Sequence, residues 1–414
     1  MVITRRQAAR LLGSTAAAAW LAAPGVSQAQ GTAKVLKIGI TLPLTGADAE
    51  SAQRILHGAQ MALDDANTKH EIPGYQLQVM IFDNGTATAG QYDPVQAATN
   101  ARRLIADGAV AAIGPQMSGS GKAMAPILSE GDLATVTPTS TNPDITDPKF
   151  ASEYDPSGKA VYFRTVTTDA YQGPELANYF AEKLGVKSVY VLDDSGAYGV
   201  GLADAFQKQA GVKGMQVMGR DRLDPKAADY SAVLTKIKAL NPVALYYGGV
   251  AQAGVKLAKQ SYDIIPKTIK GGGDGMYAIE MLTAVGFPAI EGWYATIAAP
   301  HTLDNPDAAA WVKRYNDTFH MLPDDYAITA YDAGLVIVDA IKRVVAAGKP
   351  VNKTNVRDAI QTVHVQTLQG TVSFDKYGDL TNRTISIFQI REDKNYPLTD
   401  IIHQYHYIST APQV

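Results

Sequence analysis

The sequence predicts an α/β protein made of two doubly wound, Rossmann-like lobes joined by a hinge. From Val35 onward, short apolar runs alternate with longer segments that have the periodicity of amphipathic helices. The same alternation begins again after the polar stretch at 156–159. Parallel strands require crossover connections, which helices supply. A chain of 414 residues is long enough for two or three domains, so we expect two lobes rather than one very wide sheet.

The first half of the pattern predicts the sheet of one lobe. A helix over 52–66 is indicated because Ile55, Ala59 and Leu63 fall on one face of it. A second helix is expected over 95–105. The strands are expected over 35–42, 77–82, 110–113 and 134–137.

The second half predicts another lobe and then a return to the first. Strands are expected over 161–166, 188–192, 215–218, 243–247 and 268–270, and helices over 173–184, 200–210, 230–239 and 251–261. Helices over 308–320, 327–346 and 354–362 should rejoin the first lobe, and strands over 371–374 and 384–390 should end the chain in the second. The predicted division is 34–168 plus 300–368 for the N-terminal lobe and 169–299 plus 369–414 for the C-terminal lobe.

The first 29 residues have the order of a secretory signal peptide. Arg5 and Arg6 precede an apolar run at 11–23, and the small-residue site Ser27-Gln28-Ala29 follows it. The run is too short to span a membrane. We therefore expect cleavage near Ala29 and a periplasmic mature protein. The paired arginines fit twin-arginine export about as well as ordinary secretion.

Charge and cysteine content exclude several classes of partner and chemistry. The formal net charge is −3, from 37 basic and 40 acidic residues with no long run of either sign, so nothing indicates binding to nucleic acid. Cysteine is absent, which excludes a thiolate nucleophile, a cysteine metal site and a disulfide.

The nucleotide and metal motifs in the chain are incomplete. The Ser-Gly-Ser-Gly-Lys stretch at 118–122 is no Walker A motif, because Gln116 and Ala123 stand at two of its required positions. Gly199-Val200-Gly201 lacks the third glycine of a dinucleotide fingerprint. His403 and His406 have no third ligand in view. We expect no cofactor, no metal and no catalysis, with a secreted α/β hydrolase as the remote alternative.

Three polar turns follow predicted strands, where ligands bind in open α/β sheets. Gln116, Met117 and Ser118 lie where a strand passes into a helix, whose free N–H groups suit a carboxylate. Thr139, Ser140 and Thr141 lie in a hydroxyl-rich turn between two prolines. Asp274 follows three glycines that allow a ligand close to the backbone. Each turn also has a structural explanation, as a helix cap or a tight turn.

The order of these and other motifs resembles the type I periplasmic binding proteins of branched-chain amino acid ABC transporters, the leucine/isoleucine/valine-binding group. The resemblance covers nearly the whole mature chain. It rests on Lys37-Ile38-Gly39-Ile40, Leu44-Thr45-Gly46, Ala111-Ala112-Ile113-Gly114, Thr137-Pro138-Thr139-Ser140-Thr141-Asn142-Pro143, Arg164-Thr165, Asp169-Ala170-Tyr171-Gln172-Gly173, Tyr198-Gly199, Asp229-Tyr230-Ser231 and Tyr246-Tyr247-Gly248-Gly249.

The resemblance implies a hinged cleft that closes on an amino acid and a membrane permease as partner of a monomeric protein. Ser118 and Thr141 would hold the α-carboxylate. Thr139, Thr141 and Asp274 would hold the α-ammonium. Tyr198 and one of Tyr246 and Tyr247 would close the cleft from the second lobe, and Gln116 and Met117 would border the side-chain pocket.

Two departures from the family pattern leave the ligand open. Asp274 stands where glutamate is common, and an aromatic residue of the family is replaced within Glu50-Ser51-Ala52. The alternatives within the same class are an aromatic carboxylate and a short amide such as urea. An aromatic carboxylate has no ammonium and would leave Asp274 without a partner.

Overall fold

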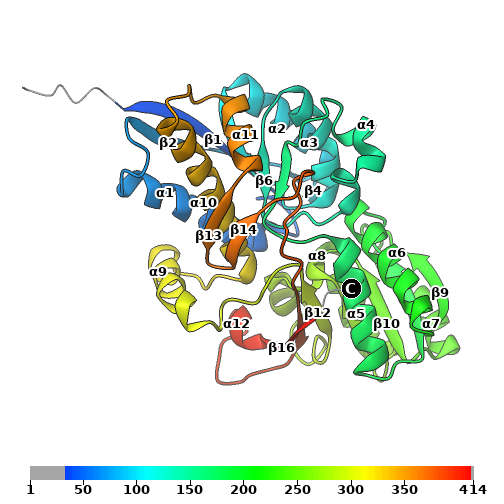
Figure 1. Ribbon diagram of the computed structural model, residues 1–414. Coiled ribbons are helices and arrows are strands. Elements are labelled where there is room, and N and C mark those ends of the chain that lie inside the picture. Colours follow the sequence, from blue (N-terminus) through cyan, green and yellow to red (C-terminus); the bar gives the residue numbers. More distant parts are fainter. Residues whose placement is uncertain (1–32, 412–414) are drawn as a thin grey trace, which may run out of the picture.

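Residues 33–411 of the computed structural model are described, and within them the chain forms two α/β lobes (Figure 1). The five-stranded sheet of the first lobe has the order β2-β1-β5-β6-β7 and is parallel throughout. The seven-stranded sheet of the second has the order β16-β15-β12-β11-β10-β8-β9, and β15 and β16 are its antiparallel edge. This confirms the predicted fold class. The predicted signal peptide, 1–29, lies outside the described residues.

The first lobe has helices on both faces of its sheet. Helices α1, α10 and α11 share a core with β1 and β5, and α2 and α3 pack on the other face around Leu104 and Met124. Its elements are β1 (Lys34–Leu42), α1 (Ala49–Thr68), β2 (Tyr75–Asp83), β3 (Gly85–Thr86), β4 (Gln91–Tyr92), α2 (Pro94–Ala106), β5 (Ala109–Ile113), α3 (Ser118–Glu130), β6 (Thr135–Thr137), η1 (Pro143–Ile145), η2 (Pro148–Phe150), α4 (Ala151–Tyr154), β7 (Tyr162–Arg164), η5 (Pro306–Ala308), α9 (Ala309–Phe319), α10 (Asp325–Ala346), α11 (Lys353–Gln361), β13 (His364–Thr367) and β14 (Gly370–Ser373).

In the second lobe, α5 packs against α6 and α7 against α8. Fully buried aromatic residues fill its interior, including Phe180, Phe206 and Tyr246. Its elements are α5 (Asp169–Glu182), β8 (Ser188–Asp193), α6 (Ala197–Val212), β9 (Gln216–Arg222), α7 (Ser231–Leu240), β10 (Ala244–Gly248), α8 (Ala251–Ile264), β11 (Ile269–Gly272), η3 (Asp274–Met276), η4 (Met281–Val285), β12 (Tyr294–Ile297), β15 (Ile385–Ile390), α12 (Ile401–Gln404) and β16 (Tyr405–Ala411).

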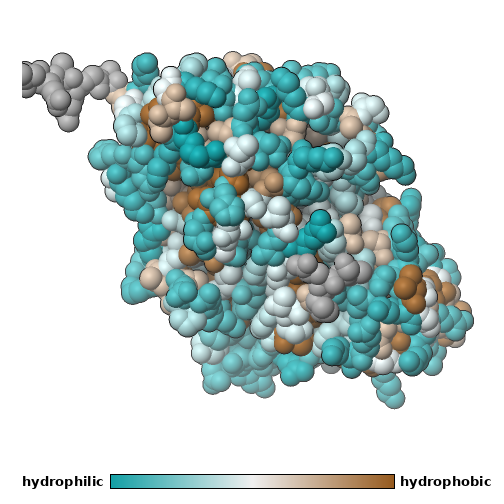
Figure 2. Space-filling view, viewed as in Figure 1, coloured by the Kyte–Doolittle hydropathy of each residue, from teal (hydrophilic) through white to brown (hydrophobic). Residues whose placement is uncertain are grey.

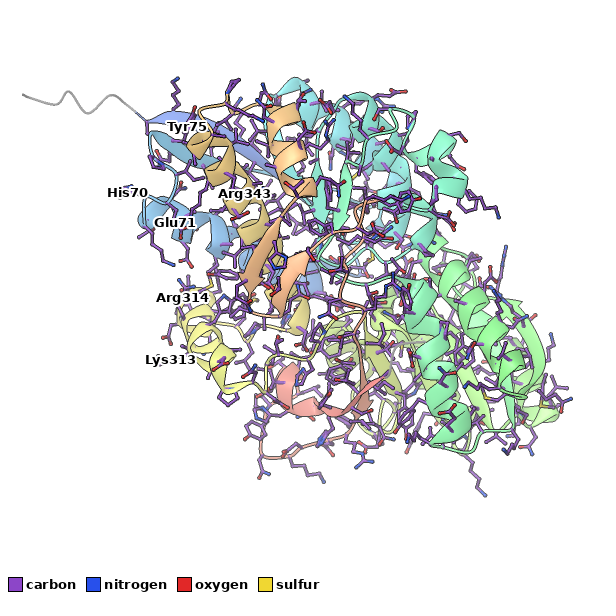
Figure 3. The ribbon with its side chains drawn as sticks, in the orientation of Figure 1. His70, Glu71, Tyr75, Lys313, Arg314 and Arg343 are labelled. Atoms are coloured by element: carbon purple, nitrogen blue, oxygen red, sulfur yellow. The ribbon has the colours of Figure 1, made fainter. Side chains whose placement is uncertain are left out.

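Helices α9 and α10 return to the first lobe, as the sequence predicts. Arg314 of α9 forms an ion pair with Asp65 of α1, and the Tyr331 hydroxyl of α10 donates to the same carboxylate at 2.9 Å. Lys342 of α10 pairs with Glu71, just beyond α1, at 2.8 Å. Figure 3 shows Arg314 and Glu71 on the same side of the molecule. These ion pairs and the long α1 to α10 contact fix the helices beside the first sheet.

The predicted strand at 371–374 is present as β14, but it does not join the second sheet. It pairs with β13 in a separate hairpin, and β13 contacts α10. Asp379, just beyond the hairpin, pairs with Arg164 of the first lobe at 2.8 Å. The pattern missed this because a short strand carries no information about its partner. Strands β3, β4, β12, β13 and β16 were also missed.

The face of the molecule in Figure 2 is mostly hydrophilic, with apolar residues in separate patches. The exposed large apolar side chains are scattered along the chain, for example Val95, Val212 and Tyr262. Within 33–411, no helix combines the length and the apolar character needed for a membrane crossing.

Candidate functional site

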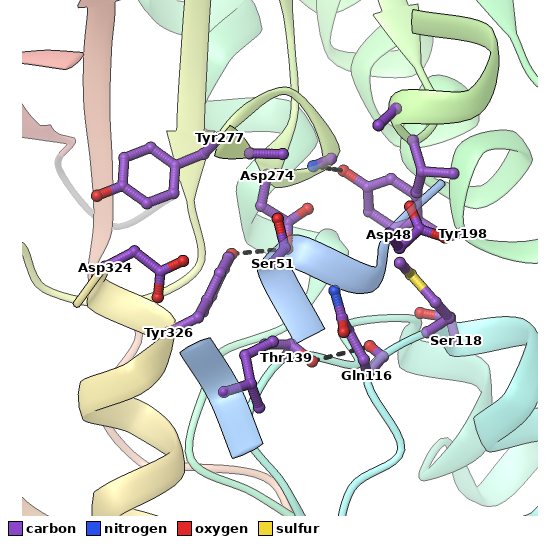
Figure 4. A pocket seen from close by; sticks show the side chains of 16 residues that line it. Asp48, Ser51, Gln116, Ser118, Thr139, Tyr198, Asp274, Tyr277, Asp324 and Tyr326 are labelled. Atoms are coloured by element: carbon purple, nitrogen blue, oxygen red, sulfur yellow. Dashed lines mark hydrogen bonds between the residues drawn. The ribbon is translucent and has the colours of Figure 1, made fainter. Parts of the chain in front are cut away.

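A pocket lies between the lobes, bordered by sixteen residues (Figure 4). The first lobe contributes the start of α1, the turn before α3, the turn after β6 and the start of α10. The second lobe contributes the start of α6 and the turns after β10 and β11. The lining residues are Asp48, Ser51, Ile55, Gln116, Met117, Ser118, Thr139, Tyr198, Val250, Ala251, Asp274, Gly275, Tyr277, Ala278, Asp324 and Tyr326.

One wall of the pocket is the N-terminus of α3. Gly114 makes the turn from β5 with φ +104, and a Cβ there would lie 2.3 Å from the Thr41 carbonyl oxygen, so glycine is required. Helix α3 then begins at Ser118, and its first N–H groups have no partner within the helix. The Ser118 hydroxyl accepts the Asn142 N–H at 3.2 Å, which leaves its own proton free to donate. This wall offers neutral hydrogen-bond donors that suit a carboxylate.

The opposite wall carries the Asp274 carboxylate. Its Oδ2 accepts the Tyr326 hydroxyl at 2.7 Å, while its Oδ1 is buried without a partner. The Asp274 N–H donates to the Gln172 side chain at 3.2 Å. The Tyr198 hydroxyl accepts the Gly275 N–H at 3.0 Å, and this fixes the turn. Burial raises the pKa of Asp274, while the hydroxyls of Tyr198 and Tyr326 oppose that rise.

A second carboxylate, that of Asp169, lies behind Asp274. It is fully buried at the start of α5, and neither of its oxygens has a hydrogen-bond partner. Its pKa is well above the ordinary value, first because of burial and then because of the charge of Asp274. The nearby Thr141 and Arg164 only partly offset this. Two adjacent buried carboxylates with free oxygens require a positively charged partner or a proton.

Asp48 and Asp324 border the same pocket, and Glu280 lies next to its lining residue Ser51. Asp48 precedes α1 but does not cap it, and its buried Oδ2 has no partner. Asp324 caps α10 by accepting the Ala327 N–H at 2.8 Å. Glu280 accepts both the N–H and the hydroxyl of Ser51. Burial, then the charges of Glu280 and Asp194, raises the pKa of Asp48 to about 7.

The predicted site residues divide into three groups. Gln116, Met117, Ser118, Thr139, Tyr198 and Asp274 line the pocket. Ser140 and Thr141 are fully buried one layer behind, where the Ser140 hydroxyl lies 3.5 Å from that of Ser118.

Tyr246 and Tyr247 of β10 do not line the pocket. The Tyr247 hydroxyl donates to the Val250 carbonyl at 2.9 Å, so the fold already uses it. Tyr246 stacks on Phe206, and its hydroxyl is buried without a partner near the charges of Asp169 and Asp274. Of the two, only Tyr246 keeps an available hydroxyl.

Several residues of the pocket were missed by sequence reasoning. Asp48 and Asp324 each immediately precede a helix, a position in which aspartate normally reads as a cap. Tyr326 lies on a helix predicted to start one residue later and carries no local sign of a binding role. The available signal was an aspartate directly before a helix. This signal does not distinguish an aspartate that caps the helix from one that binds a ligand.

Comparison with known proteins identifies the family. Residues 35–395 match the family described as periplasmic binding protein. The Leu/Ile/Val-binding protein BraC3 of Rhizobium johnstonii is 30% identical over 355 residues, which are 86% of this chain and 91% of that protein. The solved structure of the leucine-binding protein LivK of Thermotoga maritima has a TM-score of 0.77 at 25% identity and covers 91% of this chain and 98% of its own.

The fold is shared with proteins that bind other solutes. A solute-binding protein of an R. palustris ABC transporter, solved in complex with benzoate, has a TM-score of 0.73 at 19% identity and covers 92% of this chain and 97% of its own. The family match extends over most of the sequence and agrees with the two-lobed fold and the interlobe pocket. The chain belongs to the periplasmic binding protein family.

Proposed function

We propose that this protein is the solute-binding component of an ABC importer and that it captures an α-amino acid between its lobes for delivery to a membrane permease. The names of its relatives support a branched-chain or other hydrophobic amino acid. We also propose that the protein is exported, that its signal peptide is cleaved near Ala29 and that the mature protein is a monomer. We expect binding without turnover, as is usual in a family of solute-binding proteins.

The observation that carries the proposal is the opposition of the α3 N-terminus to the Asp274 carboxylate. An amino acid removed from water must have both of its charged groups satisfied. The free N–H groups of α3 and the Ser118 hydroxyl can hold the carboxylate. The unpartnered Oδ1 of Asp274 can hold the ammonium, and the buried Asp169 carboxyl lies behind it.

Hydrogen bonds between the lobes support a closed arrangement around the ligand. The Asn142 side chain donates to the Ala197 carbonyl at 3.1 Å, and that of Gln252 donates to the Ala89 carbonyl at 3.3 Å. The bond from the Ser51 N–H to Glu280, at 2.9 Å, is a third link. Hinge closure of this kind is the usual motion of two-lobed binding proteins. Small-angle scattering should therefore give a smaller radius of gyration with ligand than without it.

An aromatic carboxylate is the second candidate, because a protein of the same fold binds benzoate. Such a ligand would satisfy the α3 wall alone. It would leave Asp274 and Asp169 without a cation and would place an anion near their charges, which costs free energy. The paired acids therefore favour the amino acid.

A ligand screen tests the proposal. Thermal unfolding of the mature chain should shift upward with at least one of the twenty amino acids, because a ligand at 100 times its Kd stabilises the folded state by about 2.7 kcal/mol. Calorimetry should then show that the des-amino analogue of that amino acid binds far more weakly. A shift with benzoate and with no amino acid would refute the amino-acid assignment.

A further inference from the structure

The pocket and the layer behind it contain more carboxyl groups than one α-ammonium can contact. Asp274 and Asp169 form the first acidic group, which the proposed function assigns to the α-ammonium. Asp48 and Glu280 form a second acidic group, since the charge of Glu280 raises the pKa of Asp48, while Asp324 lies on the opposite side of the pocket (Figure 4). Among the lining residues of the described chain, none is lysine, arginine or histidine.

The second acidic group is only partly neutralised from behind. Ser51 donates two hydrogen bonds to Glu280. The backbone of Tyr92 opposes the rise in the pKa of Asp48, which is only 3% exposed and borders the pocket. Its Oδ2 has no hydrogen-bond partner, and it does not cap the helix that it precedes. A buried, unpartnered carboxylate beside a pocket is a costly arrangement that a cationic ligand would relieve.

The other lining residues indicate which kind of ligand segment lies between the two acidic groups. Ile55, Met117, Val250 and Ala251 give the pocket apolar walls. An unbranched aliphatic chain packs well on such walls while it presents a charged end elsewhere. A bare metal ion fits poorly, because within 33–411 no three acidic or histidine side chains are arranged to hold one.

We propose that the preferred ligand is an amino acid whose side chain ends in a cationic nitrogen group, an ammonium or a guanidinium, and that Asp48 recognises this group. This inference rests on the proposed function, keeps its α-amino acid, and assigns a cationic side chain in place of a hydrophobic one. Asp48 is the determinant of specificity, because its Oδ2 is the oxygen of the second acidic group that is buried without a donor.

Binding of a second cation should release a proton. In the ligand-free protein the pKa of Asp48 is raised to about 7, so the carboxyl is partly protonated at neutral pH. A cation beside it lowers that pKa, and affinity should therefore rise as the pH increases from 6 to 8. The titratable and charged groups that face Asp48 are Glu280, Asp194, Tyr92 and Tyr247.

Calorimetry with L-lysine, L-arginine, L-glutamine and L-leucine tests the inference on two proteins, the mature wild-type chain and its Asp48→Asn variant. Asp339→Asn is the matched control, because Asp339 lies on α10 and pairs with Arg343 away from the pocket. We expect lysine or arginine to bind at least ~10-fold more tightly than leucine, since a charge-assisted bond contributes more than ~1.4 kcal/mol. Asp48→Asn should remove most of this preference. Its affinity for leucine should stay within about twofold of that of the wild type.

The other outcomes separate the two proposals. Tighter binding of leucine than of either cationic amino acid would overturn the inference and keep the proposed function. The same conclusion would follow if Asp48→Asn weakened the binding of leucine and of lysine by the same factor. Tightest binding of glutamine would also overturn it, in favour of a neutral donor. Binding of none of the four would overturn both. Parallel titrations of lysine in phosphate and Tris at pH 7 should show proton release in the wild type and none in Asp48→Asn.

Discussion

The two walls of the pocket hold opposite ends of the proposed ligand by different physical means. The Ser118 wall is made of neutral donors in excess, since several N–H groups of α3 surround one hydroxyl. The Asp274 wall has few groups, but they are buried carboxylates with unpartnered oxygens. Redundant neutral donors tolerate the loss of one member, whereas a buried charge does not tolerate the loss of its partner. The comparison teaches that equal numbers of contacts need not carry equal binding energy.

Asp274→Ala should have the largest effect. It removes one partner of a sheltered charge pair, which typically costs about 3 to 5 kcal/mol, so affinity for the amino acid should fall at least ~100-fold. Calorimetry measures this, with Asp221→Ala as control because Asp221 pairs with Lys236 elsewhere on the second lobe. Binding within threefold of the wild type would show that the Asp274 wall does not hold the ammonium.

Tyr326→Phe should have the next largest effect. The Tyr326 hydroxyl donates to Asp274 Oδ2 at 2.7 Å, and a bond to a charged group contributes about 1.5 to 3 kcal/mol. Without it the pKa of Asp274 rises further and the ionised form that binds an ammonium is disfavoured. Titration at pH 7 should show weaker binding than in the wild type but tighter binding than in Asp274→Ala. Equal affinity for Tyr326→Phe and the wild type would argue that Asp274 needs no support.

Ser118→Ala tests the redundancy of the opposite wall. Backbone N–H groups of α3 still face the carboxylate, so the loss should be only about 1 to 2 kcal/mol. The des-amino analogue should lose affinity by a similar factor, since both ligands carry the carboxylate. Should Ser118→Ala weaken binding as much as Asp274→Ala, the two walls would be equivalent and the comparison would fail.

The smallest expected effect is a pH dependence of ligand affinity that arises from the Asp274 wall alone. Asp274 and Asp169 have raised pKa values, so lowering the pH toward those values protonates them and weakens the hold on the ammonium. Affinity for a neutral-side-chain amino acid should be higher at pH 7.5 than at pH 5, by less than ~10-fold, since one pKa unit corresponds to 1.36 kcal/mol. Asp274→Ala should flatten this dependence, while Ser118→Ala should leave it unchanged.

Much of the fold could be predicted because its signals are local. The periodicity of 52–66 and the apolar runs at 35–42 and 243–247 depend on neighbours within a few residues, and α1, β1 and β10 occur there. The strand predicted at 188–192 likewise occurs, as β8. The strand at 371–374 was placed with the wrong sheet, because its pairing with β13 depends on α10.

The turns at 116–118 and 139–141 and the acid at Asp274 could be chosen from the sequence alone, because polar residues after buried strands mark the binding edge of such a sheet. The choice of ligand-facing groups was decided only by the tertiary structure. Tyr326 reaches Asp274 across 52 positions of sequence, and Asp48 meets Glu280 from the other lobe. An aspartate before a helix normally caps it, and only the folded arrangement shows that Asp324 does so while Asp48 does not. Burial and missing partners, which set the charge of this pocket, exist only once distant segments exclude water together.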